Sequence, residues 1–361
     1  MAPPAVAEFP NDTKPVVAAS VMKLANELTV LPEKFVKAVG ERPVTAHNDY
    51  CKEIPVISLK GIDNESERAR IVAEVGRACA DWGIFQIVDH GMSAVLMKRT
   101  METVLEFFKL PVEEKLKCAA KPGDFPVGYA SGSHRASDDV LDWREFMAHR
   151  SLPKAIREND ISTWPDKPEH YRKTLVEYCD ACDGLVTALL GLISESLGLP
   201  TNYIKNFVGG DDADQKMILN YYPQCPMPDL TLGLRSHTDY GTITVLQQDQ
   251  VGGLQVYNAD RRKWVTVEPI PGALVVNLAD QLQILSNNKY CSVMHQAIVN
   301  SNHTRLSIAT LSNPNAMSQM GPAPELLSAE NPAKYRTYKF KEYLPICIAK
   351  KATNHCDAVA L

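Results

Sequence analysis

One stretch of the chain decides the fold: His237-Thr238-Asp239-Tyr240-Gly241-Thr242-Ile243-Thr244-Val245-Leu246. Its second half is rich in β-branched residues and predicts a strand. Its first half sets an imidazole and a carboxylate two residues apart, and on a strand such side chains point to the same face. The stretch therefore predicts a sheet that carries two metal ligands at one end of a strand.

Further candidate ligands follow along the chain. His295 lies 56 residues after Asp239, and two histidines with one carboxylate form the set that holds non-haem Fe(II) while leaving positions open. Ten residues after His295, Arg305 offers a guanidinium fork to a carboxylate, and Ser307 points to the same side of an expected strand. We expect His237, Asp239 and His295 to bind Fe(II) for reaction with O2, beside an anchor for a 2-oxo acid.

A second His-x-Asp occurs at His47 and Asp49. A lone His-x-Asp is a weak motif. This one stands in a polar stretch, and no histidine follows it at comparable spacing with an Arg-x-Ser behind. We interpret it as a chance match.

Short strand-like runs crowd the chain after Asp214, separated by Gly and Pro. They are Met217–Tyr222, Thr242–Leu246, Leu254–Tyr257, Trp264–Val267, Ala273–Asn277, Val293–Val299 and Leu306–Leu311. Many short strands at this spacing predict a sandwich or barrel, here a jelly roll. The first half is richer in helical periods, with expected strands at 55–59 and 84–88 that need a sheet to join. The predicted fold class is therefore α+β, mainly β, with a jelly-roll core flanked by helices.

The composition argues against several classes of protein. A net charge of −5 with a pI near 6.0 gives no basic footprint for nucleic acid. No apolar run approaches the roughly 18 residues that span a bilayer, and we expect no secretory signal, because the N-terminus lacks the necessary basic and apolar regions. Nine cysteines without regular spacing favour reduced thiols and a cytoplasmic location.

Three segments are expected along the chain. Residues 1–50 are predicted to form a disordered or helical N-terminal extension. Residues 51–345 are predicted to form a single domain, whose metal-binding half covers about 214–315. Residues 346–361 are predicted to form a C-terminal tail.

The motifs together resemble the plant 2-oxoglutarate- and Fe(II)-dependent dioxygenases, over most of the chain. The matching motifs are Ile54-Pro55-Val56-Ile57, Trp82-Gly83-Ile84-Phe85-Gln86-Ile87-Val88-Asp89-His90-Gly91, Asn220-Tyr221-Tyr222-Pro223-Gln224-Cys225-Pro226, His237-Thr238-Asp239, His295 and Arg305-Leu306-Ser307.

The resemblance implies a double-stranded β-helix, which is a jelly roll, with iron bound by the two histidines and the aspartate. It also implies that Arg305 and Ser307 bind the C5 carboxylate of 2-oxoglutarate. Tyr222, with Asn220 beside it, would hydrogen-bond the same cosubstrate. Ascorbate is the expected reductant.

Within that family the chain is similar to flavonoid enzymes. Asp142-Trp143-Arg144-Glu145 and the run from Gly241 to Gln255 resemble flavanone 3-hydroxylases and type I flavone synthases. Flavanone 3-hydroxylases typically carry proline directly after His-Thr-Asp, where this chain has Tyr240. The resemblance therefore implies oxidation of a naringenin-like flavanone by C2–C3 desaturation to a flavone. Flavanone 2-hydroxylation is a possible further activity, and 3-hydroxylation to a dihydroflavonol is the alternative.

Substrate-positioning residues are expected near the metal. Tyr240 is a candidate because it adjoins Asp239, and the family pattern suggests Tyr129, Phe125, Leu311 and Asn313. Two readings from other classes stay open. One is a non-catalytic jelly-roll binding protein, and the other is a relative of 1-aminocyclopropane-1-carboxylate oxidase, which would not require 2-oxoglutarate.

Overall fold

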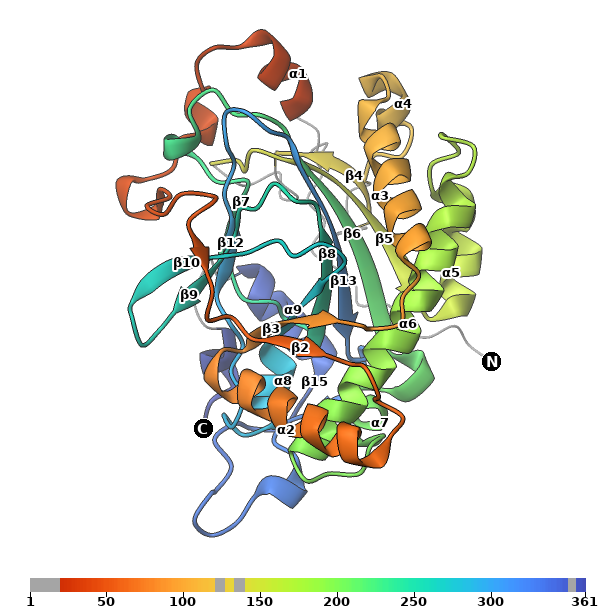
Figure 1. Ribbon diagram of the computed structural model, residues 1–361, viewed down its shortest axis with the longest axis vertical. Helices are drawn as coiled ribbons and strands as arrows, with labels where there is room; N and C mark the ends of the chain where they lie inside the picture. Colours follow the sequence, from red (N-terminus) through yellow and green to blue (C-terminus); the bar gives the residue numbers. More distant parts are fainter. Residues whose placement is uncertain (1–19, 121–126, 133–139, 350–354) are drawn as a thin grey trace.

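Two facing β-sheets form the body of the protein. The computed structural model describes residues 20–120, 127–132, 140–349 and 355–361. Within these residues the large sheet has eight strands in the order β2-β3-β11-β8-β13-β6-β5-β4, and the small sheet has five in the order β1-β10-β9-β12-β7. Figure 1 shows the small sheet on the left and the large sheet in the centre. The sheets confirm the predicted jelly roll.

The bounds of the strands agree closely with the strand-like runs of the sequence. The large sheet contains β2 (Val56–Ser58), β3 (Ile84–Val88), β4 (Gly128–Ser131), β5 (Glu145–Leu152), β6 (Asp214–Tyr222), β8 (Ile243–Gln248), β11 (Leu274–Leu278) and β13 (Arg305–Asn313). The small sheet contains β1 (Tyr50–Cys51), β7 (Leu234–His237), β9 (Leu254–Asn258), β10 (Lys263–Val267) and β12 (His295–Ala297), while β14 (Gln319–Met320) pairs with β15 (Tyr338–Lys339). The sequence patterns did not predict β1, β4, β5, β7, β14 and β15.

The central strands of the large sheet divide their side chains between two buried faces. On β8, Leu246 packs with Leu254 and Val256 of the small sheet. Its neighbour Val245 belongs instead to a core cluster shared with the helices, as Ile71 of α2 does. Because side chains alternate along a strand, the face between the sheets is the interior of the sandwich, and the opposite face binds the helices.

Helices cover the outer face of the large sheet. The helices are α1 (Val21–Glu27), α2 (Glu65–Asp81), α3 (Ala94–Lys109), α4 (Val112–Leu116), α5 (Lys154–Asp160), α6 (Tyr171–Ser196), α7 (Tyr203–Phe207), α8 (Asp280–Leu285) and α9 (Phe340–Ala349). In Figure 1, α3, α5 and α6 run along the right of the molecule and α2 lies below β2 and β3. Asn64 and Ser93 begin α2 and α3 by accepting hydrogen bonds from first-turn N–H groups.

Both ends of the described chain pack against this body. Val21 and Phe35 share a core cluster with Trp143 and Tyr222. At the other end, α9 runs across the boundary predicted at 345/346, and the short 3₁₀ helix η7 (His355–Val359) includes buried side chains. The segment predicted as a tail is therefore in part a packed element.

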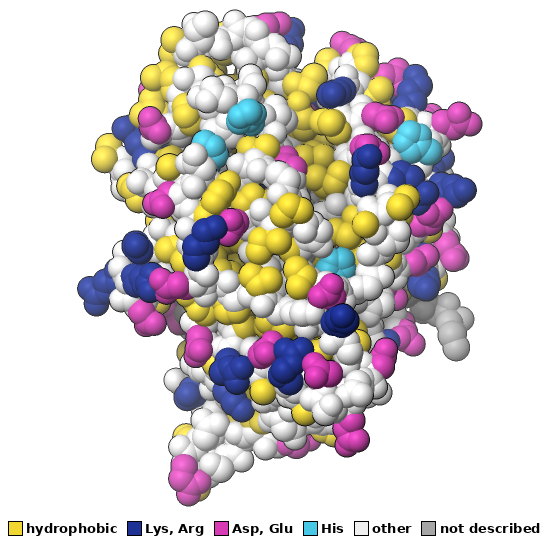
Figure 2. Space-filling model, viewed as in Figure 1, with side chains coloured by type: hydrophobic (Ala, Val, Ile, Leu, Met, Phe, Trp, Pro, Cys, Tyr) yellow, Lys and Arg dark blue, Asp and Glu magenta, His cyan; other side chains and the backbone are white. Residues whose placement is uncertain are grey.

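The surface charge is mixed. On the face seen in Figure 2, basic and acidic side chains are interspersed around a hydrophobic centre, which agrees with the weak net charge of −5. Among the described residues, no helix is long and apolar enough to cross a membrane.

Candidate active site

Two strands of the small sheet and one loop bring the three predicted ligands together. His237 ends β7 and His295 begins β12, and these residues are direct cross-strand partners. Their ring centroids are 4.2 Å apart. The Nε2 atoms of His237 and His295 lie 3.6 and 3.8 Å from Oδ1 of Asp239. The three donor atoms therefore converge on one point.

Backbone contacts fix which nitrogen of each histidine faces that point. Nδ1 of His237 lies 2.9 Å from the carbonyl oxygen of Arg235, and Nδ1 of His295 lies 3.1 Å from that of Val293. A carbonyl only accepts, so each Nδ1 carries the proton and each Nε2 keeps a lone pair for a metal. Burial and the neighbouring His295 lower the pKa of His237, which keeps this ring neutral, as a metal ligand must be.

Two residues of the large sheet hold the side chain of Asp239 in place. Its Oδ2 accepts hydrogen bonds from Thr244 Oγ1 on β8 at 2.5 Å and from Asn277 Nδ2 on β11 at 2.9 Å. Burial alone would raise the pKa of Asp239, but the two histidines and these hydrogen bonds hold it below its usual value. Asp239 is thus an ionised carboxylate with Oδ1 directed at the histidines.

The position of Asp239 differs from the one predicted from the sequence. Strand alternation was expected to align His237 with Asp239, but β7 ends at His237 and Asp239 lies in the loop before β8. The loop is shaped instead by the start of α8, because the N–H groups of Asp280 and Gln281 donate to the carbonyls of Asp239 and Gly241, each at 2.9 Å.

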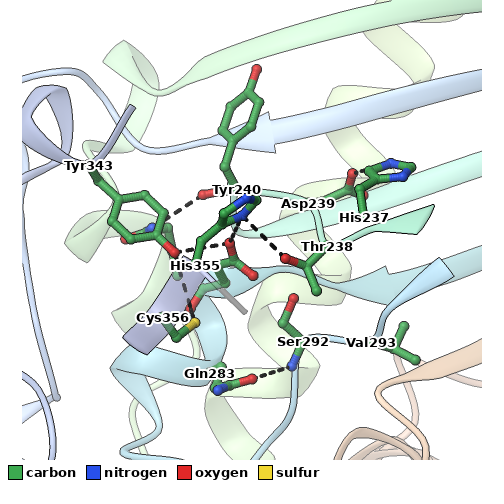
Figure 3. A network of polar contacts seen from close by, with 12 residues as sticks. His237, Thr238, Asp239, Tyr240, Gln283, Ser292, Val293, Tyr343, His355 and Cys356 are labelled. Atoms are coloured by element: carbon green, nitrogen blue, oxygen red, sulfur yellow. Dashed lines mark hydrogen bonds and ion pairs between the residues drawn. The ribbon is translucent and has the colours of Figure 1, made fainter. Parts of the chain in front are cut away.

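A buried polar network supports the loop from the side opposite the ligands. Oδ2 of Asp280 accepts from Tyr343 Oη at 3.0 Å and lies 3.3 Å from Nδ1 of His355. The same Nδ1 lies 3.4 Å from Oγ1 of Thr238. Figure 3 shows His355 between Tyr343 and Thr238, with His237 beyond. Sequence reasoning missed this network, because nothing local in the sequence pairs a residue at 280 with one at 355.

The predicted cosubstrate residues share the interior face of the large sheet. Arg305 pairs in register with Tyr222, and Ser307 with Asn220. Arg305 is buried, and its Nη2 donates to Oε1 of Gln248 at 2.9 Å while its Nε has no hydrogen-bond partner. Its guanidinium lies 5.2 Å from the centroid of the Tyr222 ring. A buried guanidinium with a donor to spare fits a carboxylate ligand. Asn220 differs, because its side-chain oxygen accepts from Arg144 at 2.7 Å.

The predicted substrate-positioning residues fall in different places. Leu311 and Asn313 lie on the interior face, where Leu311 pairs with Thr244 of β8. Tyr129 is corrected: it packs among Phe107 and other helix-facing residues, because it alternates to the outer face of β4. Phe125 lies outside the described residues.

Tyr240 packs toward the C-terminal helix. Its ring centroid is 6.5 Å from that of Phe340 in α9, and its side chain extends away from His237 and Asp239 in Figure 3. Its carbonyl accepts from Nε2 of Gln281 at 3.2 Å. Any effect of Tyr240 on a substrate therefore passes through the loop that carries Asp239.

The donor set of the site suits a particular chemistry. Two neutral imidazoles and one carboxylate leave half of an octahedron open, as non-haem Fe(II) oxygenases require. A chelating 2-oxo acid needs a distant anchor for its second carboxylate, and Arg305 lies in the same interior with a free Nε. The residues present therefore fit Fe(II) and 2-oxoglutarate together.

Comparisons with known proteins agree with this geometry. Residues 213–314 match the model of the 2OG-Fe(II) oxygenase superfamily, and residues 54–167 match that of the non-haem dioxygenase in morphine synthesis N-terminal region. A naringenin,2-oxoglutarate 3-dioxygenase of Matthiola incana is 47% identical over 82% of this chain and 81% of its own length. A flavone synthase of Petroselinum crispum is 45% identical over 82% and 80%.

Among solved structures, JOX2 in complex with 2OG, Fe and JA is similar with a TM-score of 0.87 and 34% identity, covering 97% of this chain and 100% of that one. The fold, the convergence of two histidines with an aspartate, and these relatives lead to one conclusion. The chain belongs to the 2-oxoglutarate- and Fe(II)-dependent dioxygenases and is an enzyme of that family.

Proposed function

We propose that this enzyme oxidises a naringenin-like flavanone at its C2–C3 bond, giving a flavone by desaturation. The reaction is coupled to conversion of 2-oxoglutarate and O2 into succinate and CO2. Support comes from the relatives, which are named for naringenin 3-dioxygenase and flavone synthase activity. The observation that carries the desaturation is Tyr240, which stands where flavanone 3-hydroxylases typically carry proline.

We assign His237, Asp239 and His295 as the ligands of Fe(II), which supplies oxygen activation when bound. Arg305 and Ser307 would bind the C5 carboxylate of 2-oxoglutarate, and Tyr222, with Asn220 beside it, would hydrogen-bond the same cosubstrate. This anchor sits on β6 and β13, whereas the two histidines come from the small sheet. Residues from both sheets would thereby hold the cosubstrate, with Arg305 and Ser307 at its C5 carboxylate and the metal ligands on the other sheet.

The orientation of the flavanone decides the product. C2 and C3 are neighbours, so a small tilt changes which hydrogen faces the metal. Loss of both hydrogens gives a flavone, hydroxylation at C2 gives a 2-hydroxyflavanone, and hydroxylation at C3 gives a dihydroflavonol. Flavanone 3-hydroxylation is the second candidate, because most of the similar proteins carry that name. Desaturation and 3-hydroxylation both start from the same flavanone, so one assay tests both reactions.

The nine cysteines are all free thiols. They fit a reducing compartment, and we place the enzyme in the cytoplasm.

The test is to incubate the purified protein with Fe(II), 2-oxoglutarate, ascorbate, O2 and naringenin and to identify the products by mass and chromatography. A product lighter by two hydrogens, co-eluting with apigenin, supports desaturation. A product with one added oxygen at C3 makes 3-hydroxylation the function instead.

Two controls separate the other classes of protein. Absence of iron-dependent succinate formation would favour a non-catalytic binding protein. Turnover without 2-oxoglutarate would favour a relative of 1-aminocyclopropane-1-carboxylate oxidase.

A further inference from the structure

Two arginines in the interior of the sandwich stand apart from the other buried cations. Among the described residues, most buried lysines and arginines contact a carboxylate: Lys37 with Asp142, Lys115 with Glu145, Arg157 with Asp180, and Lys216 with Asp214. Arg144 and Arg305 are 5% and 2% exposed and have no such partner within 4.0 Å. Asp142 and Asp249 attract Arg144 and Arg305 over a longer range, but neither guanidinium has a direct ionic contact with a described residue. A buried guanidinium with donors to spare fits a ligand that accepts hydrogen bonds.

Arg305 is accounted for by 2-oxoglutarate, but Arg144 is not. Its Nη1 donates to Oδ1 of Asn220 at 2.7 Å, and its guanidinium lies 4.7 Å from the ring centroid of Phe146. Its Nε is buried without a hydrogen-bond partner, and no described residue accepts from its Nη2. The Arg144 guanidinium therefore has N–H groups on Nε and Nη2 that remain available to a ligand.

Arg144 lies in the segment that leads into β5. The segment that carries it connects the sheets, because the N–H of Trp143 donates to the carbonyl of Leu232 shortly before β7. Asn220, its partner, lies on the interior face beside Ser307. The guanidinium is thus bound to Asn220, the register partner of Ser307, on a segment whose backbone is hydrogen-bonded to the chain shortly before β7.

An apolar wall adjoins the guanidinium. Ala130, Phe146 and Ala148 form a small buried cluster on β4 and β5, with Ile218 of β6 packed against it. In register, Ala130 pairs with Phe146 and Ala148 with Ile218, so these residues share the interior face. A flat aromatic ligand that carries an oxygen at one edge matches an apolar wall with N–H donors beside it.

We propose that Arg144 binds the organic substrate, donating hydrogen bonds to an oxygen at the carbonyl- and hydroxyl-bearing edge of the flavanone. This inference rests on the proposed function for the identity of the substrate. Arg144 is then the polar anchor that sets the distance of C2 and C3 from the metal, while the apolar wall contacts the ring. Arg305 and Arg144 divide the ligands between them, one for the cosubstrate and one for the molecule that is oxidised.

The test compares Arg144→Met with Arg144→Lys and with Arg157→Met as a matched control. Arg157 is equally buried, at 5% exposure, but contacts Asp180 of α6 on the helical side. Naringenin binding is measured by titration without O2, in the presence of Mn(II) and 2-oxoglutarate. We expect Arg144→Met to raise the Kd for naringenin roughly 10- to 100-fold, the range for hydrogen bonds from a charged donor. Arg144→Lys recovers part of the affinity, and Arg157→Met leaves it unchanged.

The outcomes separate this inference from the proposed function. If the unchanged enzyme binds naringenin and Arg144→Met binds it equally well, the inference is wrong while the function stands. If the unchanged enzyme does not bind naringenin, the proposed function fails first. A rise in the Kd for 2-oxoglutarate alone would assign Arg144 to the cosubstrate and overturn the inference. The Tm of Arg144→Met and of Arg157→Met is measured by thermal unfolding. Similar Tm values in the two variants would show that the lower affinity of Arg144→Met does not come from a general loss of stability.

Discussion

Arg305 and Tyr222 face each other across β6 and β13, and the guanidinium retains a buried Nε without a partner. We expect Arg305→Gln to raise the KM for 2-oxoglutarate roughly 10- to 100-fold, because a charge-assisted hydrogen bond contributes about 1.5–3 kcal/mol. Arg305→Lys keeps the charge but loses the two-pronged guanidinium. Its KM for 2-oxoglutarate is expected to lie between those of the unchanged enzyme and of Arg305→Gln. Succinate formation at varied 2-oxoglutarate measures the effect. An unchanged KM in the Gln variant would remove Arg305 from the cosubstrate site.

Tyr240 contacts its surroundings through its ring and its backbone. Its ring packs toward Phe340, and its carbonyl accepts from Gln281. Tyr240→Pro removes the ring and fixes the backbone φ next to Asp239, so we expect a larger share of 3-hydroxylated product from naringenin. Tyr240→Phe keeps the ring and should leave the product ratio as it is. The ratio is measured by chromatography of the products, and equal ratios in all three proteins would contradict a steering role.

At the scale of elements, α8, α9 and η7 support the loop that carries Asp239. His355 of η7 contacts Asp280 of α8 and Thr238 of the loop, while the N–H of Asp280 donates to the carbonyl of Asp239. We expect His355→Ala to weaken Mn(II) binding roughly 10-fold, the lower end of the effect of groups that orient metal ligands. Calorimetric titration with Mn(II) measures it. His170→Ala is the control, because His170 lies outside the network and its side chain is 47% exposed. Equal affinity for Mn(II) in His355→Ala and His170→Ala would show that the network contributes to folding alone and does not orient the metal ligands.

The same elements show what could be predicted from the sequence. Alternation along β6, β8 and β13 is a local pattern, so the strands and the shared face of Arg305 and Ser307 followed from it. The loop at Asp239 and the pair of Asp280 with His355, 75 positions apart, depend on how α8 and η7 dock. Arg144 could not be found from its motif alone either. Arg144 differs from most other buried cations in having no direct contact with a carboxylate of the described residues, and this depends on how residues far apart in the sequence pack.

For the whole molecule, the metal site joins the two sheets. His237 and His295 belong to the small sheet, and Asp239 is tied to the large sheet through Thr244 and Asn277. The interior between the sheets is apolar around Leu246 and polar around the proposed metal ligands. Apolar packing holds the sheets together in the first part, and we expect a bound metal to do so in the second. We therefore expect a bound metal to stabilise the folded protein in addition to taking part in the reaction.

We expect Mn(II) with 2-oxoglutarate to raise the Tm of the unchanged enzyme by roughly 3–4 °C, because a ligand at about 100 times its Kd contributes about 2.7 kcal/mol to the folded state and the unfolding entropy of a chain of this length is large. Chelation of the metal by EDTA should reverse the shift, and 2-oxoglutarate alone should give a smaller one. His295→Ala removes one ligand while Asp239 keeps its hydrogen bonds to the large sheet, so this variant should fold but lose the metal-dependent shift. Differential scanning calorimetry of both proteins decides the matter. An equal shift in His295→Ala would mean that the stabilising metal binds elsewhere, and the link between the sheets would then rest on apolar packing alone.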